Sequence, residues 1–107
     1  MSEKITAIYI MARHEELRPE DRGSYERPLR EQEEECRRLL QAKFGGDPEG
    51  PIRVYKSRRD LVKDVENDMV ARLVVERVDR VGGNSVEIEG FLYELERRNV
   101  EILAVHE

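Results

Sequence analysis

Short apolar segments alternate along this chain with longer amphipathic segments, and this alternation limits the possible fold more than any other feature. Residues Ile5 to Met11 read Ile-Thr-Ala-Ile-Tyr-Ile-Met. A nearly continuous apolar run of this kind, rich in β-branched and aromatic residues, is typical of a strand that is buried on both faces. Further strands are predicted at Ile52 to Tyr55, Leu73 to Val78 and Val100 to Val105.

Helices are predicted between these strands. The first runs from about Tyr25 to Lys43, and Pro28 marks its beginning because proline is tolerated only in the first turn of a helix. Its apolar residues recur at helical spacing, with Glu and Arg on the other face. These residues are Tyr25, Leu29, Cys36, Leu39 and Leu40.

The second helix is predicted from about Arg58 to Val70, with Leu61, Val65 and Met69 along one apolar stripe. This stripe should face the sheet.

The third helix is predicted to follow Gly82-Gly83. Asn84 is expected to cap it, because Glu87 three residues later completes a capping pair. The residues predicted for its buried face are Ile88, Phe91, Leu92 and Leu95.

The strand and helix order predicts an α/β fold, a three-layer open parallel sheet with helices on both faces. With 107 residues the chain suits one domain and is too short for two, so residues 1–107 are expected to form a single domain. Polar residues from Arg13 to Arg22 predict a loop after the first strand. Gly45-Gly46-Asp47-Pro48 and Gly50-Pro51 predict a turn-rich link after the first helix.

The charge balance argues against tight DNA binding by this chain alone. It has 19 Lys and Arg against 24 Asp and Glu, for a net charge of −5. Proteins that hold DNA usually neutralise its phosphates with a basic face. DNA binding is therefore expected to be weak, if present, and to fall steeply as salt is added.

The sequence predicts no cofactor and no metal. Cys36 is the only cysteine, which excludes an intramolecular disulfide and a cysteine zinc site. There is no Walker A loop and no Gly-x-Gly-x-x-Gly motif, and His14 and His106 are interpreted as surface residues. The N-terminus has no signal-peptide pattern, and no apolar run approaches the ~20 residues of a membrane helix. A cytoplasmic location without membrane contact is expected.

Charged residues follow the ends of the predicted strands. In open parallel sheets, ligands bind outside the carboxyl ends of the strands, so these residues should lie along one edge of the sheet. A helix N-terminus with arginines beside it can hold an anion. The candidates for a phosphate or anion site are Arg13, Arg58, Arg59, Asp79, Arg80, Gly82 and Gly83. The alternative is that these arginines are ordinary surface charges of an arginine-rich chain.

Several segments of the chain match motifs of one known family. Ala7-Ile8-Tyr9 matches the start of its Tyr-x-Arg-x-Ser strand motif, and Ser24-Tyr25-Glu26-Arg27 matches its Ser-Leu-Glu-x-Gln helix start. Arg58 or Arg59 before Asp60-Leu61 is similar to its Arg-x-x-Leu segment. The most specific match is Val75-Glu76-Arg77-Val78-Asp79-Arg80-Val81-Gly82, close to a strand followed by Leu-Asp-Arg-Leu-Gly-Arg. On these residues the chain resembles the N-terminal catalytic domain of the serine recombinases, the resolvases and DNA invertases.

The resemblance implies a resolvase-like fold and points to the chemistry of DNA strand exchange. In that family a serine attacks a DNA phosphate and several arginines hold this phosphate. Aligned on Tyr9, the serine position holds Arg13, and Met11 replaces the strand arginine. A shift of two residues restores the arginine as Arg13 but places Glu15 at the serine position. Neither alignment supplies a nucleophilic hydroxyl, so no catalytic residue is expected.

Other positions of the family pattern also differ. Pro28 stands at the glutamine of the helix start, and Gly83 stands at the second arginine after Asp-Arg-x-Gly. Asp79, Arg80 and an arginine at position 58 or 59 remain. Ser24 and Ser57 are the nearest hydroxyls, but they belong to other elements of the predicted fold.

Family members continue with a further strand, a long dimerisation helix and usually a DNA-binding domain, which we do not expect in residues 1–107. Three functions remain open at this stage. The first is an inactive resolvase-like domain, kept as an interaction or regulatory module linked to DNA recombination, with a protein partner or a second copy. The second is an active serine recombinase fragment, and the third is a small phosphate-binding or anion-binding domain. Whether the chain is an enzyme stays open, with the missing serine favouring no.

Overall fold

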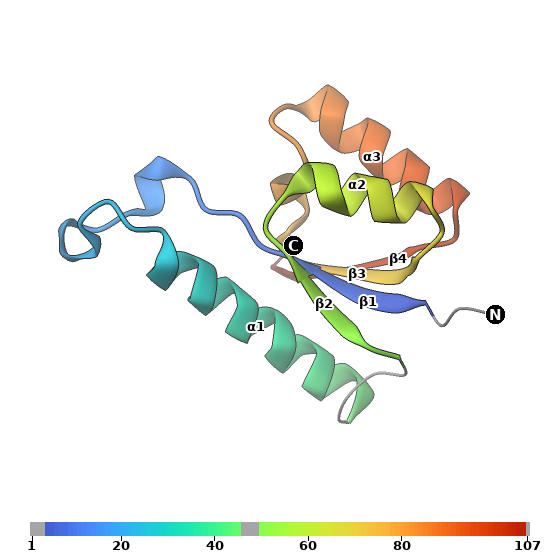
Figure 1. The fold of residues 1–107 in the computed structure, drawn as a ribbon, viewed down its shortest axis with the longest axis horizontal. Coiled ribbons are helices and arrows are strands. Elements are labelled where there is room, and N and C mark those ends of the chain that lie inside the picture. Colours follow the sequence, from blue (N-terminus) through green and yellow to red (C-terminus); the bar gives the residue numbers. More distant parts are fainter. Residues whose placement is uncertain (1–3, 46–49, 107) are drawn as a thin grey trace.

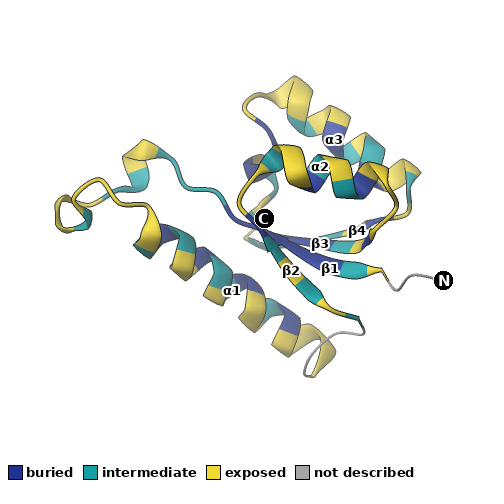
Figure 2. Cartoon of the chain, in the orientation of Figure 1, coloured by how far each residue is buried: buried dark blue, intermediate teal, exposed yellow. Residues whose placement is uncertain are grey.

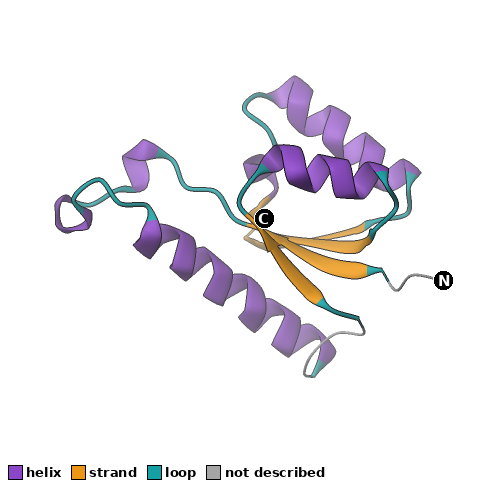
Figure 3. Cartoon of the chain, viewed as in Figure 1, coloured by secondary structure: helices purple, strands orange, loops and turns teal. Residues whose placement is uncertain are grey.

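The computed structural model describes residues 4–45 and 50–106. Four parallel strands form one sheet in the order β2-β1-β3-β4, and helices lie on both faces of it (Figure 1, Figure 3). The elements in chain order are β1 (Ile5–Tyr9), the 3₁₀ turns η1 (His14–Glu16) and η2 (Pro19–Asp21), α1 (Glu26–Phe44), β2 (Ile52–Tyr55), α2 (Arg58–Glu66), β3 (Val70–Arg77), η3 (Val78–Val81), α3 (Ser85–Arg97) and β4 (Glu101–His106). The predicted α/β fold, with a parallel sheet between two helical layers, is confirmed.

β1 lies in the middle of the sheet, where both of its faces are covered (Figure 2). Ile8 and Ile10 belong to the core under α1, whereas Ala7 and Tyr9 belong to the core under α2 and α3. These four side chains are at most 4% exposed. The continuous apolar run of the first strand follows from this position, because a strand with two buried faces has no polar side.

α1 covers one face of the sheet alone. Its buried residues, Pro28, Gln32, Cys36 and Leu40, lie four apart and form one stripe along the helix. Cys36 is fully buried, as its place on the apolar stripe predicted. Burial raises the pKa of its thiol to about 12, so the thiol stays protonated and acts as a small apolar group.

α2 is shorter than predicted, and β3 begins earlier. The helix ends at Glu66 because the chain turns at Asp68, whose φ is 57°. Val70, predicted as the last residue of the helix, begins β3 and is 1% exposed. Met69, predicted on the buried stripe, is 41% exposed. The sequence Asn67-Asp68 could have predicted this turn, because Asn and Asp favour turns and tolerate the left-handed conformation.

Smaller differences concern the other element boundaries. β1 ends at Tyr9 instead of Met11, and β3 ends at Arg77 instead of Val78. Tyr25 lies before α1 and is 38% exposed, so it is not part of the buried face of this helix. β4 is displaced by one residue from the predicted range. The predicted turn residues Gly46, Asp47 and Pro48 lie outside the described residues, as the ranges above indicate.

The connection from β3 to α3 agrees with the predicted cap. The side-chain oxygen of Asn84 accepts a hydrogen bond from the backbone N–H of Glu87 at 2.9 Å. Phe91 and Leu95 are buried against the sheet, and Ile88 and Leu92 pack partly against the same core. No helix within the described ranges is both long enough and apolar enough to cross a membrane.

Gly82→Ala is expected to destabilise the fold by about 1–3 kcal/mol. An added Cβ would lie only 2.9 Å from the backbone nitrogen of Ile88 and 2.9 Å from Cβ of Glu87, so α3 would have to move away from η3. Gly83→Ala is the matched control, because its Cβ would meet only Oε1 of Glu87 at 3.7 Å. Urea unfolding should give a clearly lower midpoint for the first variant than for the second. Equal midpoints would contradict this packing.

Candidate functional site

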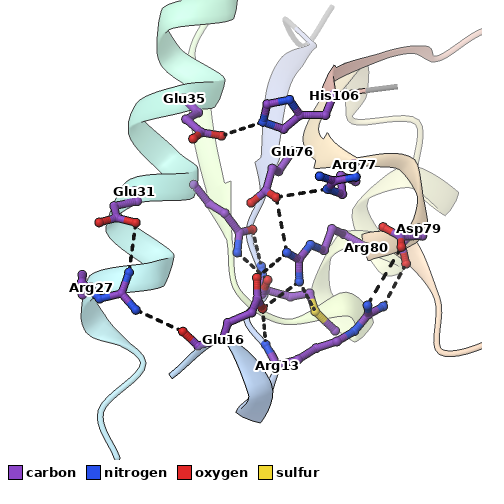
Figure 4. A network of polar contacts seen from close by, with 12 residues as sticks. Arg13, Glu16, Arg27, Glu31, Glu35, Glu76, Arg77, Asp79, Arg80 and His106 are labelled. Carbon is purple, nitrogen blue, oxygen red and sulfur yellow. Dashed lines mark hydrogen bonds and ion pairs between the residues drawn. The ribbon is translucent and has the colours of Figure 1, made fainter. Parts of the chain in front are cut away.

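The carboxyl end of β3 and the segment after β1 bring five charged residues together (Figure 4). We call this cluster the rim. It consists of Arg13, Glu16, Glu76, Asp79 and Arg80. Because β1 and β3 are directly paired in the sheet, the elements that follow them meet at the same edge.

Arg80 is the buried centre of the rim and is 6% exposed. Its Nη1 donates to one carboxylate oxygen of Glu16 at 2.9 Å, and its Nη2 donates to the other. Nη2 also donates to Glu76 at 3.4 Å, and Nη1 lies 3.8 Å from the sulfur of Met11. The hydrogen bond with Glu16 raises the pKa of Arg80, so the guanidinium stays charged. Two carboxylates therefore already occupy the outer nitrogens of this arginine.

Glu16 holds Arg80 from η1, at the far side of the segment that follows β1. Its carboxylate also accepts a hydrogen bond from the backbone N–H of Arg13 at 2.5 Å. The hydrogen bond from Arg80 holds the pKa of Glu16 below its usual value of 4.5. Glu16 is thus ionised over most of the pH range, in a bidentate pair of the kind that is strongest between Arg and a carboxylate.

Arg13 and Asp79 form the outer part of the rim. The two side chains are 40% and 53% exposed, and Nη1 of Arg13 lies 4.0 Å from the carboxylate of Asp79. Nη2 of Arg13 also donates to the backbone carbonyl of Asp79 at 3.5 Å. Exposed pairs at this distance contribute little to stability. The contacts between Arg13 and Asp79 nevertheless show that both sequence-predicted residues lie at this edge of the sheet.

The segment from η1 to η2 forms an arm that projects beside the start of α1 (Figure 1). Arg27 of α1 fixes this arm at two points. Its guanidinium donates to the carboxylate of Asp21 at 2.8 Å and to the backbone carbonyl of Glu16 at 3.1 Å. The hydrogen bond from Arg27 lowers the pKa of Asp21 to about 2. The guanidinium of Arg27 thus holds η2 through the side chain of Asp21 and η1 through the backbone carbonyl of Glu16.

Gln32 connects α1 to the residue that follows the central strand. Its side-chain amide accepts from the backbone N–H of Met11 at 3.1 Å and donates to the carbonyl of Met11 at 2.6 Å. Gln32 is only 3% exposed. Its amide provides hydrogen-bond partners for the backbone N–H and carbonyl of Met11, just after the end of β1. It therefore sets the path of the chain toward Glu16.

No sequence pattern marks Glu16, Arg27, Gln32 or Glu76 as site residues. Gln32 gave one usable signal, since it lies four residues before Cys36 on the buried stripe of the helix. Glu16 gave none, because nothing in the sequence distinguishes it from its neighbour Glu15.

The arginines that begin α2 have other contacts. Nε of Arg58 donates to the backbone carbonyl of Val81 at 2.7 Å, and its guanidinium lies 5.4 Å from the ring centre of Phe91. Arg58 therefore joins the start of α2 to η3 and α3. Arg59 is exposed and lines a surface depression of about 590 Å³ along α2. Gly82 contacts the first turn of α3, as described above, and Gly83 is exposed.

The two hydroxyls considered as replacement nucleophiles serve the ends of helices. Ser57 caps α2 by accepting from the N–H of Asp60 at 3.3 Å. Ser24 accepts from the N–H of Glu26 at 3.2 Å, just before α1 becomes regular. Neither hydroxyl is among the hydrogen-bond partners of Arg80 within the described ranges.

His106, at the end of β4, lies 3.5 Å from the carboxylate of Glu35 on α1. In residues 4–45 and 50–106, no three His, Cys, Asp or Glu side chains come together as metal ligands would.

No protein-family model and no curated protein matches this chain. Its structure is similar to the crystal structure of the C-terminal catalytic domain of ISC1926 TnpA, an IS607-like serine recombinase, with a TM-score of 0.65. The two share 18% sequence identity, and the alignment covers 96% of this chain and 70% of that one. A likeness at this identity concerns the fold. The chain has a serine-recombinase-like α/β fold.

Glu16→Gln is expected to lower the free energy of unfolding by about 1–2 kcal/mol near pH 7, because a neutral amide cannot replace a carboxylate beside Arg80. The lowered pKa values of Glu16 and Asp21 also predict acid sensitivity. A carboxyl group whose pKa is lower in the folded state stabilises the fold above its unfolded pKa, and this contribution is lost as the pH falls through the folded pKa.

Stability should therefore decline from about pH 4.5 toward pH 2, and the decline should be smaller in Glu16→Gln. Urea titrations at a series of pH values measure this. A control is Glu15→Gln, at the neighbouring exposed position. If Glu15→Gln and Glu16→Gln behaved alike at every pH, the pair with Arg80 would contribute no specific stability.

Proposed function

We propose that this chain is a serine-recombinase-like domain without strand-exchange chemistry, which acts as an interaction or regulatory module linked to DNA recombination. One observation carries the proposal. Arg80, which the family motif equates with an arginine that holds phosphate, is buried and paired with Glu16 and Glu76. These two carboxylates support the proposal, because they already pair with the arginine that an active enzyme would be expected to use for DNA phosphate.

The side chains at the two alternative serine positions support the same proposal. Phosphoryl transfer through a covalent intermediate needs a nucleophile in line with phosphorus and charge stabilisation around it. Arg13 has no atom that attacks phosphorus, and Glu15 is an exposed carboxylate that repels a phosphate. Residues 1–107 are proposed to work as one such domain, in the cytoplasm.

The charge of the rim favours a protein partner over DNA. Its carboxylates, Glu16, Glu76 and Asp79, are balanced by Arg13 and Arg80 together with Arg77, whose Nε lies 3.6 Å from the carboxylate of Glu76. DNA-binding surfaces gather positive charge, and this edge has no excess of it. The regulatory role would then operate through contact with a recombinase or another protein of the recombination process.

Supercoiled plasmid DNA incubated with the purified chain is expected to stay supercoiled, with no nicked circle and no protein–DNA adduct. Binding to labelled duplex DNA should be weak and should disappear as salt is raised toward 150 mM. A complete serine recombinase with its own site is the positive control.

A phosphoserine bond to DNA would contradict the proposal and establish an active fragment. Ser24→Ala and Ser57→Ala then identify which hydroxyl reacted. Nanomolar DNA binding at physiological salt would also contradict it. The regulatory part is tested by adding the chain to a complete serine recombinase of the same genome, where an unchanged recombination rate and no complex would argue against that role.

A further inference from the structure

The arm, residues 14–21, contributes nothing to the interior of the protein. Its residues are exposed or partly exposed, and none of them is buried. Within residues 4–45 and 50–106, neither core cluster includes a side chain of the arm. Figure 1 shows the arm projecting away from the sheet, beside the start of α1. Movement of the arm away from the sheet would therefore expose little apolar surface, and the sheet and helices would keep their packing.

Two arginines outside the arm hold it in place. Arg80 of η3 binds both carboxylate oxygens of Glu16 (Figure 4). Arg27 of α1 binds both carboxylate oxygens of Asp21. Pairs of this kind fix geometry closely, but they are made of polar groups that water can also satisfy. The arm is thus attached by charged contacts that can be exchanged for contacts with water, without loss of core packing.

The two turns of the arm are coupled to each other through Arg27. Its guanidinium donates to Asp21 of η2 at 2.8 Å and to the backbone carbonyl of Glu16 of η1 at 3.1 Å. The docked carboxylates also shape the turns. Glu16 accepts from the N–H of Arg13, and Asp21 accepts from the N–H of Arg18 at 2.8 Å. A 3₁₀ turn of three residues is too short to persist alone, so η1 and η2 should lose their shape together when the arm leaves.

The chain just after η2 can serve as a hinge. Arg22 and Gly23 follow each other in the left-handed conformation, with φ values of 51° and 82°. Both residues are exposed, and a Cβ added at Gly23 would meet no atom within 4 Å. Hinges are a few loop residues, often small ones, that absorb changes of φ and ψ. This pair can therefore reorient without disturbing its surroundings.

We propose that the arm is a latch on the rim, which undocks and redocks as one unit while the sheet, α1, α2 and α3 stay folded. In the docked state Glu16 pairs with Arg80. In the undocked state Arg80 keeps Glu76 as its carboxylate partner and is open to water on the side that Glu16 has left. Access to the rim then depends on one movement of the arm. The latch goes beyond the proposed function, because it operates whether or not a partner binds at this edge.

Native-state hydrogen exchange on the full chain, followed by NMR in urea below the unfolding transition, tests the latch. The N–H groups of Glu16, Leu17, Asp21 and Arg22 report on the arm, because each donates to a backbone carbonyl within it. These amides should share one protection factor, roughly a hundredfold or more below that of amides in the middle of β3. The exchange of the arm should hardly change with urea, because undocking exposes little surface, whereas that of β3 should accelerate steeply.

Glu16→Gln tests whether the two turns move as one unit. It removes the pairing carboxylate of η1, and it should lower the protection of η1 and of η2 by the same factor, about tenfold, although the substitution lies in η1 alone. Arg27→Gln should do the same from the side of α1. Arg30→Gln, at an exposed position of the same helix, is the matched control and should change protection in the arm by no more than about twofold.

Three results would overturn the latch. Exchange of the arm with the same urea dependence as β3 would show that the arm opens only when the whole domain unfolds. Absence of any protection in the arm would show that it has no docked state. Loss of protection confined to η1 in Glu16→Gln would show that the two turns move separately. The urea series on the wild type decides the first two of these even if a variant fails to fold.

Discussion

A guanidinium as deeply buried as that of Arg80 needs carboxylates beside it, because an unpaired buried charge is strongly destabilising. Glu16 reaches it from the arm after β1, and Glu76 reaches it from β3 itself. Arg27 fixes the other end of the same arm through Asp21, and Gln32 directs the chain out of β1. A few polar contacts between residues far apart in the sequence therefore hold the arm, η3 and the end of β1 together at this edge of the sheet.

The order of strands and helices and the burial of β1 on both faces could be predicted from the sequence. Both depend on the spacing of apolar residues within each segment, which can be read locally. It failed at the end of α2, where Val65, Met69 and Val70 fit a helix pattern although the chain turns at Asp68. It also failed at Glu16, whose role depends on a partner 64 residues away. Contacts of this kind arise from the folded sheet, and no local pattern reveals them.

A fold similar to that of a serine recombinase catalytic domain does not by itself bring that domain's chemistry, since function depends on the site and not on the scaffold. The segment around Arg80 resembles a recombinase motif in sequence, and Arg80 contacts carboxylates of the same chain.

The central claim is that Glu16 and Glu76 occupy Arg80 in place of a phosphate. The most direct test is a titration of the protein with inorganic phosphate, followed by NMR through the Arg80 Nε–H signal and the backbone amides of Gly82 and Gly83. The account predicts no saturable shift of these signals up to tens of millimolar phosphate. Saturable shifts centred on Arg80 at low millimolar phosphate would contradict it, because they would show that an external anion displaces the carboxylates.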